Sequence, residues 1–304
     1  MTDRQTHEGG ADAPRITQEM IALYDDYTHL SLDRRKFMDQ LAKLAGSMSA
    51  ATAAAALMAA DAQAQGLVGE DDERLSIETV TYPGGEGEMS GYLVAPREGG
   101  PFGAVIVVHE NRGLNAHIRD VARRVALEGF IALAPDYLSR LGGTPENEDE
   151  ARSMFGNLDP AGVVADGVAT IAYLKGLENA NGNIGAMGFC WGGGTVNTLA
   201  ANSPDLAAAV AYYGSQPAPE DARNIAARLM LHYAGLDDRI NAGIPAFEDA
   251  LKAGGVDYQL FMYEGVNHAF NNDTSAARYD AQAAELAWRR TMDFFHETLD
   301  DGEG

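Results

Sequence analysis

The 304-residue chain contains a single cysteine, and its surroundings are typical of a nucleophile. Cys190 lies in the run Gly188–Gly192, which has the form Gly-x-Cys-x-Gly. This is the pattern of a nucleophile elbow with sulfur in place of oxygen, in which a sharp strand-to-helix turn exposes the reacting side chain. The flanking residues must be small because they lie against the facing chain, and a helix beginning directly behind the thiol favours its thiolate form. We therefore predict that Cys190 is a nucleophile rather than an inert buried thiol.

An acid and a histidine follow the cysteine, in the order nucleophile, acid, histidine that α/β-hydrolases use. Asp237 follows the apolar run 229–233, and His268 follows the apolar run 258–263. The histidine can move a proton to and from the reacting groups, while the aspartate fixes its tautomer and stabilises the imidazolium. Asp238 is a rival to Asp237, because spacing alone cannot separate two adjacent acids. These residues predict a Cys-His-Asp triad.

The remaining histidines and glycines match no recognised metal or nucleotide motif. His109, Glu110 and His117 lack the i, i+4 histidine pair of zinc hydrolases, and a cysteine cluster is absent from the sequence. The run Gly192–Gly194 is not followed by the Gly-Lys-Ser/Thr of a phosphate loop. His232 falls inside an apolar run and is expected in or near the core. We therefore predict no metal site and no cofactor.

Short apolar runs that alternate with amphipathic stretches predict a mostly parallel sheet covered by helices. The near-continuous apolar runs expected as buried parallel strands are 104–108, 130–134, 184–189, 207–213, 229–233 and 258–263. Residues 76–82 and 89–94 are expected to form an antiparallel hairpin that precedes them. The predicted fold class is α/β, with the mostly parallel central sheet and flanking helices of the α/β-hydrolase fold.

Helices are expected between these strands, where apolar residues recur at helical spacing. The helical patterns cover 118–125, 164–171 and 244–251, and a longer helix is expected over about 276–298. Their apolar residues, Val168 among them, are predicted to face the core. Residues 141–150 are rich in Gly, Pro and acids and are expected to form a surface loop.

With these residues and the segment 108–115 (VHENRGLN) in view, the chain resembles the dienelactone hydrolase family over roughly residues 75 to 300. In that family a glutamate after an early strand contacts the nucleophilic cysteine and takes part in its activation. The resemblance assigns that role to Glu110. It also implies an oxyanion hole made by the backbone amides of Asn111 and Trp191, which would stabilise a tetrahedral oxyanion.

One departure from the family concerns the substrate. Dienelactone hydrolases hold a substrate carboxylate with arginines, one of them four residues after the catalytic histidine, where this chain has Asn272. The arginines that could replace the missing charge from another place are Arg112, Arg119 and Arg152. The candidate substrate contacts are Arg112, Asn272 and Tyr137, the last as an aromatic residue of the pocket lining. The substrate expected from this change is a neutral lactone or a simple ester.

Residues 1–64 differ from the hydrolase-like domain expected over 65–304. Residues 33–38 (DRRKFM) resemble a twin-arginine export signal, and the Ala-rich stretch that follows is too mild for a stable membrane span. Small residues around 60–64 offer cleavage sites, so we expect an exported, for example periplasmic, mature chain beginning near Gln63 or Gln65. The alternative is a cytoplasmic protein in which this segment is an N-terminal helix.

The charge balance narrows the possible partners. Lys and Arg total 22 against 45 Asp and Glu, so the formal net charge of −23 disfavours nucleic acid and anionic membranes. The expected function is hydrolysis of a small ester or lactone through a covalent thioester. The alternatives are a general carboxylesterase or thioesterase, or an exported binding protein without turnover on the same fold. The oligomeric state is left open.

Overall fold

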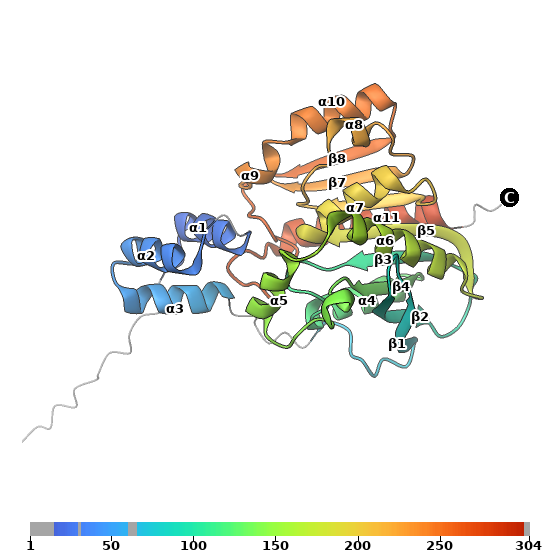
Figure 1. Cartoon of the computed structure of the whole chain (residues 1–304), viewed down its shortest axis with the longest axis horizontal. Coiled ribbons are helices and arrows are strands. Elements are labelled where there is room, and N and C mark those ends of the chain that lie inside the picture. The colour runs from blue at the N-terminus through green and yellow to red at the C-terminus, as the bar shows by residue number, and fades with distance from the viewer. Residues whose placement is uncertain (1–14, 30–31, 60–65, 301–304) are drawn as a thin grey trace, which may run out of the picture. The chain divides into compact units, whose positions relative to one another are not determined.

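The computed structural model describes residues 15–29, 32–59 and 66–300, and the chain divides into two compact units (Figure 1). The first comprises residues 1–62 with 275–277, and the second comprises residues 63–274 with 278–304. Each unit has a hydrophobic core of its own.

The N-terminal unit contains three helices, α1 (Gln18–Thr28), α2 (Arg34–Ala45) and α3 (Met48–Ala59). The side chain of Asp33 accepts a hydrogen bond from the Lys36 amide at the start of α2, and Gly46 ends that helix with a φ of 81°. Such an acceptor satisfies an amide that the first helical turn leaves without a partner. The core of this unit consists of Met20, Ile21, Leu23, Tyr24, Tyr27, Phe37, Leu41, Ala51, Ala54 and Met58.

The segment expected to direct export falls on α2 and α3. Among the described helices, no single one is long and apolar enough to cross a membrane. Residues Arg34–Ala45 and Met48–Met58 meet that criterion together, but they are bent by 109° at the break between them. A signal sequence meets the same criterion, so the export expectation stays a prediction. The expected cleavage positions around 60–65 lie outside the described residues.

The larger unit is built on an eight-stranded sheet in the order β1-β2-β4-β3-β5-β6-β7-β8. The first two strands form an antiparallel hairpin, β2 pairs antiparallel with β4, and all other pairs are parallel. The strands are β1 (Leu75–Pro83), β2 (Glu88–Pro96), β3 (Phe102–Val108), β4 (Ile131–Asp136), β5 (Ala180–Phe189), β6 (Ala208–Tyr212), β7 (Arg228–Ala234) and β8 (Tyr258–Tyr263). The mostly parallel sheet and the hairpin predicted from the sequence are confirmed.

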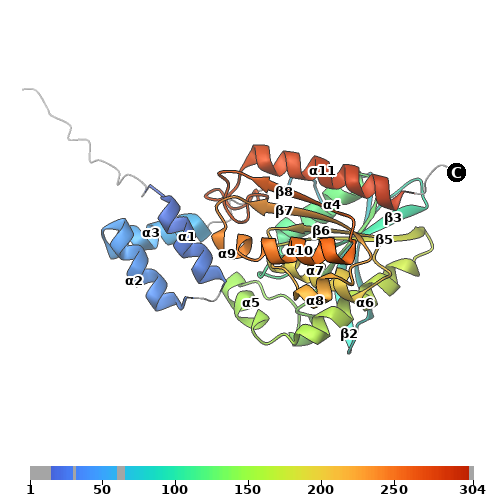
Figure 2. The same ribbon diagram turned by 90° about the horizontal axis from the view of Figure 1, so that it is seen from above.

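Helices cover both faces of this sheet, and Figure 2 shows α10 and α11 on opposite sides of β7 and β8. Alternate residues of β3 divide between two core clusters, with Val105 and Val107 packed in the cluster of α4 and α11. Ala104, Ile106 and Val108 belong to the cluster of α6, α7 and α10. The helical elements of this unit are α4 (Ala116–Leu127), η1 (Ser139–Leu141), α5 (Glu148–Phe155), α6 (Pro160–Lys175), α7 (Trp191–Asn202), α8 (Pro219–Ala222), α9 (Asp238–Asn241), α10 (Ile244–Gly254) and α11 (Ala281–Leu299).

Several local expectations were wrong. The surface loop expected over 141–150 ends early because Asn147 caps α5. The long helix expected from about residue 276 begins only at Ala281. Val168 is 41% exposed, although its apolar spacing predicted a core face. The reason is that α6 turns polar residues inward: Asp166 binds Arg140 at 2.6 Å, and Thr170 bonds the Tyr82 hydroxyl at 2.9 Å.

Candidate active site

Cys190 lies in a strained turn between β5 and α7, as the elbow motif predicts. Its φ of 56° and ψ of −113° lie outside the usual regions for a residue with a side chain, and its amide donates to the Tyr212 carbonyl at 3.0 Å. A Cβ on Gly188 would come within 2.3 Å of the Gly192 carbonyl oxygen, and one on Gly192 within 2.4 Å of the Val108 carbonyl oxygen. Both glycines are therefore required by close backbone contact.

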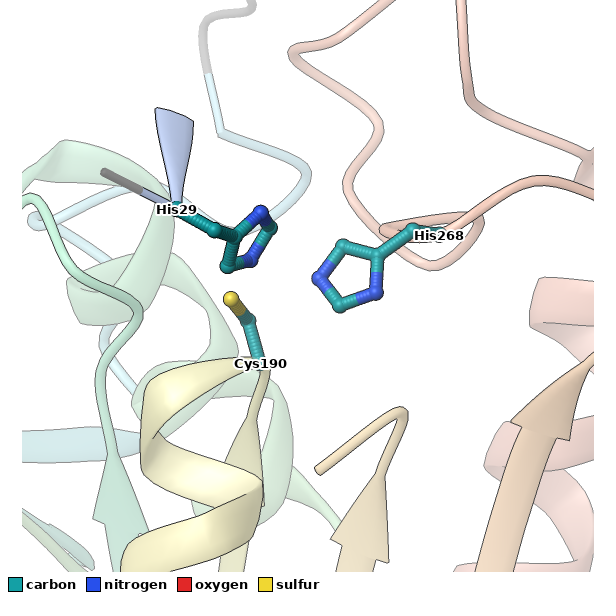
Figure 3. Close-up of side chains that lie close together, drawn as sticks. All are labelled: His29, Cys190 and His268. Carbon is teal, nitrogen blue, oxygen red and sulfur yellow. The ribbon is translucent and has the colours of Figure 1, made fainter. Parts of the chain in front are cut away.

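His268 lies beside this cysteine and binds Asp237 on its other side. A ring nitrogen of His268 lies within 4.8 Å of the Cys190 sulfur, and Figure 3 shows the ring turned toward that sulfur. The Nδ1 atom of His268 is 2.5 Å from the Asp237 carboxylate. The histidine is 2% exposed and the aspartate 7%, so the contact is shielded from water. Such an arrangement can pass a proton between a thiol and a reacting group.

The charges around His268 favour its imidazolium form. Burial alone lowers the pKa of His268, but the Cys190 charge and the bond to Asp237 outweigh it and raise that pKa to about 10. Burial also acts to raise the pKa of Asp237, yet its bond to His268 brings the net shift below the ordinary value. Both shifts have the sign expected of a buried ion pair between His268 and Asp237.

The structure separates the two adjacent acids. Asp237 is buried, and its second oxygen accepts a bond from the Ile240 amide at 3.2 Å as the cap of α9. Asp238 is exposed in the first turn of the same helix. The carboxylate that contacts His268 is therefore that of Asp237.

Glu110 follows β3 and is held by the side chain of Asn272. The Asn272 amide donates to the Glu110 carboxylate at 2.8 Å, and both residues are buried. The Asn272 oxygen in turn accepts bonds from the Thr274 amide at 3.0 Å and its hydroxyl at 2.6 Å. These bonds fix which end of the Asn272 amide faces the glutamate, so Glu110 has a neutral partner at this position.

The other candidate substrate contacts are engaged by neighbouring side chains or buried. Arg112 binds Glu148 at 2.6 Å, Arg152 lies 3.2 Å from Asp149, and Arg119 lies over the Tyr92 ring. Tyr137 has no exposed surface and belongs to the core, so its expected place in the pocket lining is corrected. Its ring is enclosed by those of His109 and Trp191, which it meets edge to face.

The two amides implied for the oxyanion hole directly follow Cys190 and Glu110 in the chain. Trp191 is the first residue of α7, where helical amides have no partner within the helix. Asn111 follows Glu110 directly beyond β3. Donors at such positions can stabilise an oxyanion formed at the cysteine.

Two further residues of the site were not predicted as such. Tyr213 follows β6 with a φ of 40°, and its ring centroid lies 4.9 Å from that of His268. Its hydroxyl is buried without a hydrogen-bond partner in the described part of the chain, and burial and then the Glu110 charge raise its pKa well above the ordinary value. His109 is fully buried before Glu110. Both residues could have been found from their place in the sequence, because each lies at the carboxyl end of a predicted strand, where the catalytic groups of such sheets gather.

A sequence model of the dienelactone hydrolase family matches residues 89–299. The chain belongs to the dienelactone hydrolase family. A protein of Methylorubrum extorquens provisionally named a carboxymethylenebutenolidase is 33% identical over 77% of this chain and 85% of its own length. A protein of Synechocystis with the same provisional name is 34% identical over 72% of this chain and 96% of its own length.

Solved structures agree with this family assignment. One is a crystal structure of a Klebsiella pneumoniae protein provisionally named a dienelactone hydrolase, which is 27% identical to this chain with a TM-score of 0.67. The match covers 73% of this chain and 99% of the other. This dienelactone hydrolase family member is thus an enzyme of the hydrolase class. A second family model, described as YqhI-like, matches residues 11–46.

Proposed function

We propose that this protein cleaves a neutral carboxylic ester or lactone through a covalent thioester on Cys190. The observation that carries the proposal is the contact series from Cys190 through His268 to Asp237, buried at the carboxyl ends of β5, β8 and β7. A thiolate and imidazolium in this order are equipped for acyl transfer.

In the first half of the reaction, the Cys190 thiolate attacks the carbonyl carbon and forms a carbon–sulfur bond. The carbonyl electron pair moves to oxygen, where the amides of Trp191 and Asn111 stabilise the charge. The oxyanion then collapses and expels the alkoxide, which takes its proton from the His268 imidazolium. Asp237 holds the ring in the tautomer that this transfer requires.

In the second half, water releases the acyl group. His268, now neutral, removes a proton from a water molecule that attacks the thioester carbonyl. The new oxyanion collapses, the carbon–sulfur bond breaks, and the carboxylic acid leaves. The thiolate and the imidazolium are restored, so the cycle closes without a cofactor.

The neutral side chain of Asn272 beside Glu110 supports the proposal that the substrate is neutral. Asn272 offers the site an amide rather than a guanidinium, and its two ends are engaged by Glu110 and Thr274. An amide cannot form the charge-assisted pair by which an arginine selects a carboxylate. The named relatives therefore indicate the reaction class, while the substrate of this chain is a lactone or ester without a carboxylate.

The test is a panel of neutral lactones, aryl esters, thioesters and a carboxylate-bearing lactone, assayed with wild-type protein and three variants. Cys190→Ala is expected to abolish turnover, and Asp237→Asn to lower kcat by roughly a hundredfold or more. Asp238→Asn is the matched control and is expected to retain wild-type activity. Equal rates for wild type and Cys190→Ala would contradict the proposal.

Two other functions give different results in the same panel. A general thioesterase would prefer thioesters to lactones by kcat/KM. A binding protein without turnover would leave every substrate intact and its Cys190 unreactive toward iodoacetamide at neutral pH. The buried acid–histidine pair beside the thiol favours catalysis over binding alone.

Location is part of the proposal. The arginine pair at 34 and 35 with Phe37 behind it supports export through the twin-arginine route, with cleavage near residue 63 or 65. The mass of the native mature protein tests it, since an intact Met1 end would contradict cleavage.

A further inference from the structure

His109 is buried completely and carries no assigned role, but it bonds the carbonyl directly before Asn111 and its ring packs on that of Trp191. Its Nδ1 atom lies 2.7 Å from the Glu110 carbonyl oxygen, and its Nε2 atom lies 3.2 Å from the Tyr137 amide nitrogen. Its ring stacks on that of Trp191, with centroids 5.5 Å apart and planes 14° from parallel.

The two hydrogen bonds fix the tautomer of this histidine. The backbone amide of Tyr137 can only donate, so Nε2 must carry a lone pair. Nδ1 then carries the proton and donates it to the Glu110 carbonyl oxygen. Burial also lowers the pKa of His109, which agrees with a neutral ring.

The bond to the Glu110 carbonyl has a geometric consequence for the next amide. A trans peptide is planar, with the carbonyl oxygen and the following amide hydrogen on opposite sides. The ring that holds the Glu110 carbonyl therefore also sets the direction of the Asn111 N–H. The same ring stacks on Trp191, whose amide begins α7, and a Cβ on Gly192 would come within 2.5 Å of the His109 carbonyl oxygen.

We infer that His109 is the positioning residue of the oxyanion hole, because it aims the Asn111 amide and braces Trp191 beside the nucleophile. The inference rests on the proposed function, since an oxyanion must form at Cys190 for these amides to act. His109 does not touch the substrate and moves no proton in the cycle. It acts by holding the two donors still before the charge develops.

The first test compares His109→Phe, which keeps the ring but loses both hydrogen bonds, with His109→Asn, whose amide can still donate from near the Nδ1 position. We expect His109→Phe to lower kcat roughly 10- to 100-fold with little change in KM, because a misaimed donor weakens only the transition state. His109→Asn is expected to recover most of that loss. His232→Phe is the matched control: it is also fully buried and bonded at both nitrogens, and it is expected to lower stability but not kcat.

A second readout separates the oxyanion hole from the nucleophile. Alkylation of Cys190 by iodoacetamide needs the thiolate but forms no oxyanion, so its rate and pH profile should be unchanged in His109→Phe. If His109→Phe does not fold, His109→Asn is compared with His109→Gln, whose amide cannot donate from the Nδ1 position. Asn is then expected to retain the higher kcat.

The outcomes are distinct. The inference is overturned if His109→Phe hydrolyses esters at the wild-type rate, if alkylation falls in proportion to hydrolysis, or if Gln restores more activity than Asn. If wild-type protein itself hydrolyses no ester, the proposed function fails. A selective loss of kcat in an otherwise active enzyme supports His109 as the positioning residue.

Discussion

At the scale of single residues, the protonation of His268 depends on the groups at both ends of its ring. Burial removes water from the ring and disfavours its charge, yet the pKa is raised to about 10. Among the favourable influences, the Cys190 charge is larger than the bond to Asp237. Cys190 and Asp237 therefore together outweigh the burial of the His268 ring and favour its imidazolium form.

Replacing Cys190 by a group that stays neutral should lower the pKa of His268. In Cys190→Ser the side chain carries no charge at pH 7, so burial is opposed by Asp237 without the Cys190 charge, and we expect the pKa to fall. Histidine NMR titration of the folded protein measures it. A pKa still near 10 in Cys190→Ser would show that the Cys190 charge does not raise it.

Asn272 is the residue at which substrate choice should be most easily changed. Asn272→Arg places a guanidinium at the position where the resemblance to the family implies an arginine. The kcat/KM for a carboxylate-bearing lactone should then rise about tenfold relative to that for a neutral ester. Asn272→Gln keeps the amide and serves as the control, with no change in preference expected. Steady-state kinetics on the two substrates gives the ratio, and an unchanged ratio in Asn272→Arg would remove Asn272 as the determinant.

At the scale of elements, the elbow depends on contacts between the backbones of β3, β5 and α7. The close approach of Gly192 to the Val108 carbonyl oxygen leaves no room for a methyl group. The neighbouring atom is backbone and cannot move aside as a flexible side chain would.

Gly192→Ala should therefore lower the free energy of unfolding by about 3 kcal/mol and abolish hydrolysis. Gly156→Ala is the matched control, because its Cβ would meet only the Ser153 carbonyl oxygen at an ordinary 3.7 Å. We expect that variant to stay within about 0.5 kcal/mol of wild type. Urea denaturation measures both, and a Gly192→Ala protein as stable as Gly156→Ala would contradict the packing account.

The elements also show how far the sequence could predict this molecule. Buried parallel strands are visible as apolar runs, and the glycines around Cys190 mark the elbow, because both signals are local. The inward face of α6 could not be predicted, since Asp166 is accommodated by Arg140, 26 residues earlier. The bond between Asn272 and Glu110 spans 162 residues and leaves no local pattern.

The same limit applied to His109. Its spacing from the other histidines matches no metal motif, and only the fold shows what its two nitrogens bind. Asp237 and Asp238 could not be separated either, because one residue of spacing decides which carboxylate turns inward. The sequence thus predicted the strand ends at which the candidate residues lie, but not every contact made there.

At the scale of the whole molecule, the chain has an acidic surface and two units with separate cores. The formal charge of −23 agrees with a small neutral substrate and disfavours polyanionic partners. The arginine pair proposed for export is exposed on α2, while Phe37 behind it is buried in the core of the N-terminal unit.

Export can be tested without disturbing that unit. Arg34→Lys with Arg35→Lys keeps the charge and the exposed position but removes the paired arginines that the export machinery reads. In a bacterium that has the twin-arginine pathway, we expect this variant to remain in the cytoplasm at full length. Arg74→Lys with Arg97→Lys is the control and should still be exported. Cell fractionation with mass spectrometry measures both, and export of the Arg34, Arg35 variant at the wild-type level would contradict the signal.

The central claim is that Cys190 carries the acyl group during turnover. Wild-type protein is mixed with a small aryl ester, quenched in acid within the first turnover and digested for mass spectrometry. The account predicts an acyl mass on the peptide that contains Cys190, which decays as the carboxylic acid appears and is absent from Cys190→Ala. Ester hydrolysis that proceeds at an equal rate in Cys190→Ala, with no acyl group on the wild-type thiol, would contradict it.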